Sequence, residues 1–283
     1  MLKRFRLEEP QSIAEVAELL GRFGDSAKIY AGGTELLLAM KEGLVDYERL
    51  VNIKKVKGLN DISTINGTIK IGALCTHYQL ENSSALKEKL PSLVKLEQNV
   101  ANVRVRHAGT IGGNLCFAEP HADPGTLLIA LGATMTAAKG SSSREIPAAD
   151  FFVDAYETSL AAEEVLTELR IPAPAPDARS VYLKFGYLER PSVGVALALN
   201  LNGGAVRNVR VAVGCAGPAP KRVEDAEALL EGKGVDEALG HLAQAGTIAG
   251  RASQAISDLH GSQEYKEHIV GVLLKRAFHS AVS

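Results

Sequence analysis

The sequence has 283 residues, of which 46% are hydrophobic and 23% charged, and its formal net charge is −2 at pH 7. This length favours two domains, and the balance of residues is that of a soluble globular protein. The near-neutral charge gives no reason to expect nucleic acid as a partner, and no apolar run approaches the roughly 20 residues that cross a bilayer. No signal peptide is recognisable at the N-terminus, so the cytoplasm is the default expectation.

The three cysteines, Cys75, Cys116 and Cys215, are far apart and form no CxxC pair. Their spacing argues against a disulfide framework, a zinc site or an iron–sulfur cluster held by this chain alone. The histidines lack a metal-binding spacing such as HExxH, and no nucleophile–base set is evident. We therefore expect buried or half-buried thiols and assign neither a metal site nor a catalytic residue. His107 and His121 could contact a ligand or a partner, although a surface role is favoured.

The first part of the chain predicts alternating short helices and strands. Ser12 is a plausible N-cap, with Glu15 completing a capping box, for a helix that ends at Gly24. Further elements are predicted, in chain order, as a strand over 27–33, a helix over 34–43, strands over 50–56 and 68–74, the second after a turn at Asn66-Gly67, a helical stretch over 84–100 broken at Pro91, and a loop over 106–114.

The second part predicts a hairpin and then a separate sheet. The elements are a turn-rich opening and helix over 117–132, a hairpin over 134–152, a strand over 164–172, three antiparallel strands over 180–188, 194–201 and 206–215, and helices from Arg222 onward. The proline- and alanine-rich stretch 172–179 is the best candidate for a domain boundary. The predicted fold class is α+β, with a mixed first domain over 1–173 and a smaller domain of sheet and helices over 178–283.

The stretch AGGTELL (31–37) places two glycines between a predicted strand and the start of a predicted helix. Gly32 and Gly33 allow a tight turn and a close approach of a ligand to the backbone amides. The helix start favours an anion, and Thr34 adds a hydroxyl donor. A diphosphate is the ligand that such a loop suits.

The stretch TIGGN (110–114) repeats this pattern later in the same domain. We expect Gly112 and Gly113 to expose backbone donors, while Thr110 and Asn114 offer side-chain hydrogen bonds. Two such loops could hold both phosphates of a dinucleotide. Neither loop is GxGxxG and the sequence contains no GxxxxGK[ST], so the Rossmann and P-loop folds are disfavoured. Shape alone does not name the ligand.

Four stretches carry a family resemblance: AGGTELLLAMK, GTIGGNLCFAEPHADP, EVLTELRIP and YLKFGYLERPSVGVALAL. They resemble the FAD-binding medium subunits of the molybdenum hydroxylases, the family of xanthine dehydrogenase and aerobic carbon monoxide dehydrogenase. The stretch GSQEYKEHIVGVLLKRAF is similar to the closing helix of that family, so the resemblance covers nearly the whole chain. It implies a two-subdomain flavin-binding domain of the vanillyl-alcohol-oxidase (PCMH) type, followed by a C-terminal domain of the carbon monoxide dehydrogenase flavoprotein type.

By position, the resemblance implies FAD contacts in both glycine-rich loops and at four further residues. These residues are Ile29, Tyr30, Ala31, Gly32, Gly33, Thr34, Glu35 and Leu36 in the first loop, Thr110, Ile111, Gly112, Gly113 and Asn114 in the second, and Val100, Asp123, Leu166 and Lys184 elsewhere. Val100 would pack against the isoalloxazine, and Asp123 would hold the adenine–ribose part or nearby backbone. The alternatives are that Asp123 caps a helix and that Lys184 is a solvated strand lysine.

Two departures from the family pattern narrow the resemblance. Some relatives cover the flavin ring with an aromatic residue near positions 191–193, where this chain has Pro191-Ser192-Val193, so the ring is either more open or covered by another residue such as Tyr187. The cysteine-rich insertion of the 4-hydroxybenzoyl-CoA reductase branch is absent.

The function that the resemblance implies is electron relay, because FAD can accept electrons singly and release them in pairs. Electrons would come from a large molybdopterin subunit through a small subunit with two [2Fe–2S] clusters, and would leave to an external acceptor. The expected assembly is a dimer of heterotrimers. The alternatives are a self-contained FAD-dependent oxidase or dehydrogenase, which the short second domain disfavours, and a non-redox nucleotide-binding module.

Overall fold

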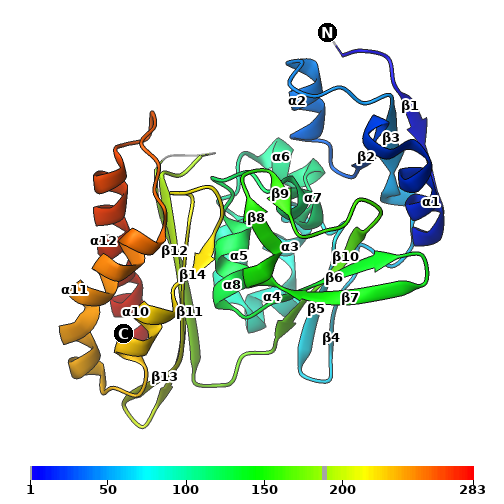
Figure 1. The fold of residues 1–283 in the computed structure, drawn as a ribbon. Helices are drawn as coiled ribbons and strands as arrows, with labels where there is room; N and C mark the ends of the chain where they lie inside the picture. The colour runs from blue at the N-terminus through cyan, green and yellow to red at the C-terminus, as the bar shows by residue number, and fades with distance from the viewer. Residues whose placement is uncertain (1, 187–189) are drawn as a thin grey trace.

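The computed structural model describes residues 2–186 and 190–283, whose strands form four sheets (Figure 1). The N-terminal lobe contains a small parallel sheet in the order β1-β3-β2, with α1 packed on it. Its elements are β1 (Arg6–Glu8), α1 (Ile13–Phe23), a 3₁₀ turn (Gly24–Ser26), β2 (Ala27–Tyr30), α2 (Leu36–Lys41), β3 (Arg49–Asn52) and a second 3₁₀ turn (Ile53–Lys55). The strands predicted over 27–33 and 50–56 are therefore shorter than expected.

Helix α1 begins at the predicted cap. The Ser12 side chain accepts a hydrogen bond from the Glu15 amide, and Gly24 ends the helix with a φ of 49°. The second half of the predicted capping box is wrong, because the Glu15 carboxylate accepts from the amide of Gln11. That amide lies one residue before the N-cap amide of Ser12, which a capping box would use.

A five-stranded antiparallel sheet in the order β4-β5-β10-β6-β7 forms the centre of the molecule. Its strands are β4 (Ile62–Ile65), β5 (Thr68–Gly72), β6 (Thr134–Lys139), β7 (Ser142–Pro147) and β10 (Val165–Pro172). The accompanying helices are α3 (His77–Asn82), α4 (Ser84–Lys89), α5 (Pro91–Glu97), α6 (Val103–Ala108), α7 (Ile111–Phe117), α8 (Pro124–Ala130) and α9 (Ala148–Phe151), and a small ribbon is made by β8 (Phe152–Asp154) and β9 (Glu157–Thr158). The predicted turn at Asn66-Gly67, the break at Pro91 and the 134–152 hairpin are confirmed.

The loop predicted over 106–114 is wrong, since most of it belongs to the short helices α6 and α7. Asn102 caps α6 by accepting from the amides of Arg104 and Val105. Thr110 caps α7 by accepting from the amide of Gly113. The sequence did not predict these helices, because the glycines in this stretch have a low helix propensity.

The C-terminal part is a four-stranded antiparallel sheet covered by helices on one face (Figure 1). Its elements are β11 (Ala178–Phe185), β12 (Val193–Asn202), β13 (Ala205–Gly214), β14 (Lys221–Arg222), α10 (Glu224–Leu230), α11 (Val235–Ala252) and α12 (Gln263–Val282). The strands predicted over 194–201 and 206–215 and the helices after Arg222 are confirmed, while the strand predicted over 180–188 is found as β11, and residues 187–188 of that prediction lie outside the described residues.

The two faces of β12 serve two cores, because side chains alternate along a strand. Val193, Val195 and Leu197 pack with the C-terminal helices. Ala196 belongs instead to the core of the central sheet, where α8 contacts β12 and β13. Small side chains on this face let the C-terminal sheet lie close to α8. In residues 2–186 and 190–283, no helix has both the length and the hydropathy needed to cross a membrane.

Candidate functional site

The first glycine-rich loop connects β2 to α2 and offers free backbone donors. Gly33 has a φ of 74°, and a Cβ there would lie 2.3 Å from the Tyr30 ring, so only glycine fits without rearrangement. Within the described part of the chain, the amides of Gly32, Gly33 and Thr34 donate to no protein acceptor. Three such amides beside a chain turn suit an anionic ligand.

The second glycine-rich segment differs from the expectation. Its amides have partners within the chain: Ile111 donates to Cys75, Gly112 to Ala73, and Gly113 to the Thr110 hydroxyl. A Cβ on Gly112 would lie 2.6 Å from the Cβ of Ala73, so this glycine serves internal packing. The prediction that Gly112 and Gly113 expose backbone donors is therefore wrong, because these amides complete a helix cap and a bridge to residues 73–75.

Asn114 offers a polar group that the rest of this segment lacks. Its Oδ1 is buried and has no hydrogen-bond partner among the residues that the structure describes. A buried acceptor without a donor is costly, at about 1–3 kcal/mol, so the position favours a donor from outside the chain.

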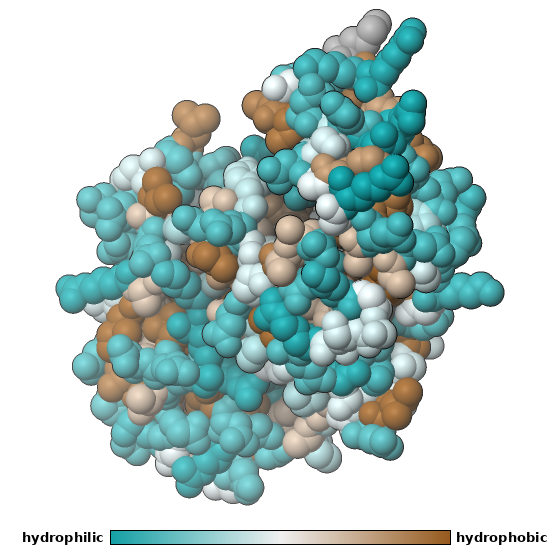
Figure 2. All heavy atoms as spheres, turned by 45° about the vertical axis from the view of Figure 1, so that its right-hand side comes forward, coloured by the Kyte–Doolittle hydropathy of each residue, from teal (hydrophilic) through white to brown (hydrophobic). Residues whose placement is uncertain are grey.

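The two segments lie against each other. A Cβ on Gly32 would lie 2.3 Å from the carbonyl oxygen of Ala108 and 2.8 Å from the Cα of Gly109. The Thr34 hydroxyl lies 3.4 Å from the position of a Cβ on Gly109. Thr110, which follows directly, therefore lies beside the first loop. Figure 2 shows a notch in the surface between the lobe that carries the N-terminus and the lobe of the C-terminal helices.

Asp123 and Lys184 are paired, which neither alternative interpretation foresaw. Asp123 is 6% exposed, and its two carboxylate oxygens accept from the Tyr182 hydroxyl at 2.5 Å and from the Lys184 ammonium at 2.7 Å. Although Asp123 stands at the start of α8, its side chain makes no capping hydrogen bond. Lys184 also donates to the carbonyl of Asn99 and is only 18% exposed, so it is not a solvated strand lysine.

This pair joins the central part of the molecule to β11. Burial raises the pKa of Asp123 above its ordinary value, while Lys184 and Tyr182 act in the opposite direction. Burial also raises the pKa of Cys215 well above its ordinary value, and its thiol lies 3.8 Å from the Tyr182 hydroxyl. Tyr182 was missed in the sequence, although residues two apart on a strand share a face and it precedes Lys184 by two positions.

Val100 and Leu166 are core residues. Their exposed fractions are 7% and 3%, and both belong to the central hydrophobic cluster. Val100 follows Asn99, whose carbonyl accepts from Lys184, so it lies near the ion pair. A ligand could therefore contact only a narrow exposed edge of each side chain. Tyr187, suggested as a cover for the flavin ring, lies outside the described residues.

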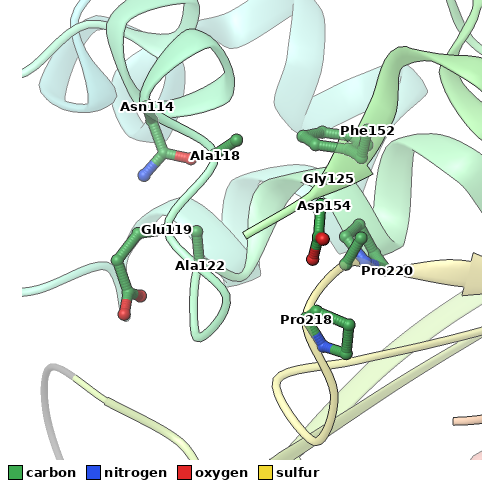
Figure 3. Close-up of a pocket in the computed structure, with 10 residues that line it drawn as sticks. Asn114, Ala118, Glu119, Ala122, Gly125, Phe152, Asp154, Pro218 and Pro220 are labelled. Carbon is green, nitrogen blue, oxygen red and sulfur yellow. The ribbon is translucent and has the colours of Figure 1, made fainter. Parts of the chain in front are cut away.

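A small pocket borders the second segment (Figure 3). One side is lined by Asn114 of α7 and by Ala118, in the turn that follows α7. The other side is lined by β8 and residues 218–220. Glu119 and Asp154 place two carboxylates at this pocket, and Figure 3 shows both side chains around the opening. Carboxylates repel phosphate and accept from hydroxyl and amino groups, so the pocket suits a sugar or base edge better than a diphosphate.

The structure shows what surrounds His107 and His121, the two histidines that the sequence placed near the second segment. His107 is exposed and stacks on Tyr78 with ring centroids 3.8 Å apart. His121 contacts the Glu119 carboxylate at 2.9 Å and lies 3.8 Å from Asp258 of the C-terminal part. Neither touches the first loop through a described contact. A third histidine, His77, is buried beside the junction of the two segments, and no local sequence signal marked it.

The residues present fit a dinucleotide such as FAD. Free amides in the first loop would donate hydrogen bonds to the diphosphate, and the Asn114 oxygen and the two carboxylates would accept hydrogen bonds from a nucleoside. Among residues 2–186 and 190–283 no group of three or more His, Cys, Asp or Glu side chains is arranged to hold a metal ion. The three cysteines are free thiols, two of them buried, as expected.

Comparison with known families covers nearly the whole chain. Residues 3–174 match the family described as the FAD binding domain in molybdopterin dehydrogenase, and residues 190–281 match the CO dehydrogenase flavoprotein C-terminal domain. The carbon monoxide dehydrogenase medium chain of Hydrogenophaga pseudoflava is 32% identical over 280 residues, covering 98% of this chain and 97% of the relative. The nicotine 6-hydroxylase medium subunit of Paenarthrobacter nicotinovorans is 33% identical over 281 residues, covering 97% and 96%.

Comparison with solved structures gives relatives of the same family and the same fold. A chain of the Hydrogenophaga pseudoflava carbon monoxide dehydrogenase that lacks the Mo-pyranopterin moiety superposes with a TM-score of 0.95 at 33% identity, covering 100% of this chain and 98% of that one. A chain of quinoline 2-oxidoreductase from Pseudomonas putida 86 gives a TM-score of 0.91 at 30% identity, covering 99% and 98%. With this fold, these two domains and a loop of free amides at the junction, the chain belongs to the FAD-binding medium subunits of the molybdenum hydroxylases, the oxidoreductase family of carbon monoxide and xanthine dehydrogenases.

Proposed function

We propose that the chain relays electrons within a molybdenum hydroxylase complex. It would take them from [2Fe–2S] clusters of a small partner subunit and pass them to an external acceptor, while a large molybdopterin subunit oxidises the substrate. Bound FAD supplies the redox chemistry, since it can take up electrons singly and release them in pairs. The contribution of this chain is to bind, orient and shield that cofactor.

The first loop carries this proposal. Its amides at Gly32, Gly33 and Thr34 have no acceptor among the described residues, and the loop packs directly against residues 108–109. We assign the diphosphate to these amides. The backbone of Ile29 to Leu36 would form one wall of the site.

The second segment is proposed to bind through side chains. The Thr110 hydroxyl and the buried Asn114 oxygen would contact the cofactor, while Ile111, Gly112 and Gly113 hold them in place. Asp123 and Lys184 are proposed to act as a pair, with the carboxylate orienting the ammonium towards the cofactor.

Val100 and Leu166 remain proposed contacts of the flavin ring. Both lie in the central core, so such contacts would use the narrow exposed edge of each residue.

The domain limits and the assembly are also proposals. We assign 1–173 to FAD binding and 178–283 to the C-terminal domain, supported by the two separate family matches and by the end of β10 at Pro172. We propose a dimer of heterotrimers in the cytoplasm, in keeping with relatives whose names are medium chains or subunits.

A visible spectrum of the purified chain, alone and with co-expressed partners, tests the proposal. Flavin absorption together with inertness towards small organic substrates without partners would support it. Turnover of an organic substrate by the chain alone would favour a self-contained oxidase or dehydrogenase. An intact complex without flavin would contradict the proposal and would favour a non-redox nucleotide-binding module.

Variants can locate the cofactor within the chain. Thr34→Val and Asn114→Leu each remove a polar side chain at the proposed site and are expected to lower FAD retention. Thr247→Val is the matched control, because this exposed hydroxyl on α11 bonds only within its helix. A Gly112→Val change is unsuitable, since its side chain would collide with Ala73.

A further inference from the structure

A buried histidine lies beneath the junction of the two glycine-rich segments. His77 is 2% exposed, and its amide donates to the carbonyl of Gly109. The neighbouring residue Thr76 forms a β-bridge with Thr110. The start of α3 is therefore joined to the second segment by backbone contacts, and the His77 ring is held at this join.

One edge of the His77 ring lies beside Gly109, at the start of the second segment. Its Cδ2 atom lies 3.3 Å from the position of a Cβ on Gly109, and the Thr34 hydroxyl lies 3.4 Å from the same point. The ring edge that carries Cδ2 and Nε2 therefore borders the same space, where a side chain on Gly109 would lie, as the Thr34 hydroxyl of the first loop. Among the described residues, Nε2 has no hydrogen-bond partner.

The opposite edge of the ring is fixed by a buried carboxylate. Nδ1 of His77 lies 2.5 Å from Oε2 of Glu97, whose side chain is fully buried. The other oxygen of Glu97 has no partner in the part of the chain that the structure describes. A buried carboxylate without compensation costs several kcal/mol, so this site favours a cation beside it. The imidazole of His77 is the group that the geometry places beside this carboxylate.

An anion on the far side of the ring would complete this arrangement. A protonated His77 donates Nδ1–H to Glu97 and turns Nε2–H towards the junction of the loops. A phosphate oxygen there would accept a hydrogen bond from Nε2–H, on the side of the ring opposite the Glu97 carboxylate. The hydrogen bond would join two charged groups, which is the stronger kind.

We propose that His77, oriented by Glu97, is a binding residue for the cofactor diphosphate and donates from Nε2 to a phosphate oxygen. This inference rests on the proposed FAD site and adds a side-chain cation to a loop that otherwise offers backbone amides. Glu97 is a positioning residue, because it acts through the histidine. The two are 20 residues apart in the sequence and come from different helices, α3 and α5.

FAD titration of the flavin-depleted chain tests the inference, with His77→Gln and Glu97→Gln as variants and His107→Gln as control. His107 is exposed nearby but stacks on Tyr78. Losing a hydrogen bond between charged groups should weaken FAD binding about tenfold to a hundredfold in His77→Gln, with a smaller loss in Glu97→Gln. The ³¹P resonances of bound FAD should shift in both variants and stay unchanged in His107→Gln.

The outcomes separate this inference from the proposed function. If wild-type chain and intact complex bind no FAD, the proposed function fails. If the wild type binds FAD and both variants match it in affinity and ³¹P shifts, the role of His77 is overturned while the proposed function stands. Should His77→Gln fail to fold by circular dichroism, the Glu97→Gln titration and its ³¹P spectrum decide in the same way.

Discussion

The Asp123–Lys184 ion pair provides a sharp prediction, because it joins the central part of the molecule to the C-terminal sheet. Lys184→Met keeps the aliphatic stem and removes the ammonium, leaving a carboxylate that is 6% exposed and, among the residues that the structure describes, has only the Tyr182 hydroxyl as partner. Breaking one side of a buried pair costs about 3–5 kcal/mol. Since the Lys184 side chain is 18% exposed, we expect about 2–4 kcal/mol.

The double variant Asp123→Asn with Lys184→Met shows whether the two groups are coupled. Neutralising the carboxylate removes the stranded charge, so the double variant should be more stable than Lys184→Met alone, by about 1–2 kcal/mol. Urea unfolding followed by circular dichroism measures each free energy. Lys87→Met on the exposed face of α4 is the control and should change the stability little.

The pH dependence of this variant has a definite sign. A carboxyl group whose pKa is raised by folding stabilises the fold at low pH, and this contribution is lost as the pH rises through the folded pKa. Burial already raises the pKa of Asp123, and removing Lys184 removes an opposing influence. Lys184→Met should therefore differ most from the wild type at neutral pH and converge with it at acidic pH. A constant difference, or a double variant no better than the single one, would refute the reasoning.

Two further variants probe the packing of the loops and a surface ion pair. Gly32→Ala should lower FAD retention markedly, because its Cβ would lie 2.3 Å from the Ala108 carbonyl oxygen and would force the two segments apart. Gly240→Ala is the control, because it has open space around it in α11 and should leave flavin content and stability unchanged. The flavin content per chain is measured for both variants. Glu164→Gln should lower the free energy of unfolding at neutral pH but not at low pH. The hydrogen bond from Arg144 lowers the pKa of Glu164 from 4.5, and the stabilisation is lost as the pH falls through that lowered value. Urea unfolding at both pH values measures the difference, and a difference that does not change with pH would contradict the prediction.

The fold was predictable where local chemistry decides it. The Asn66-Gly67 turn has positive φ at both residues, 49° and 73°, as the sequence pattern requires. The apolar stretch 194–201 predicted a strand, and the structure has β12 over Val193–Asn202. The two short helices around 103–117 were not predictable from propensity, because their caps depend on which side chain turns back to which amide.

The site was predictable as a set of positions but not as a mechanism of binding. Glycine spacing located both segments, yet only the structure shows that Gly32 leaves room for Ala108 while Gly112 leaves room for Ala73. The pairing of Asp123 with Lys184 joins residues 61 positions apart. Tertiary packing sets such contacts, and no periodicity along the chain records them.

The proposed function requires this chain to hold FAD and to pass electrons through it. The most direct measurement is the flavin content of the purified complex, followed by stopped-flow absorbance when the flavin-loaded chain is mixed, anaerobically, with a reduced small iron–sulfur subunit freed of excess reductant, or with the same buffer lacking that subunit. We expect about one FAD for each chain, as for a single cofactor site. We also expect faster flavin reduction when the iron–sulfur subunit is present. A complex without flavin, or flavin reduction at the same rate without the iron–sulfur subunit, would contradict the proposed function.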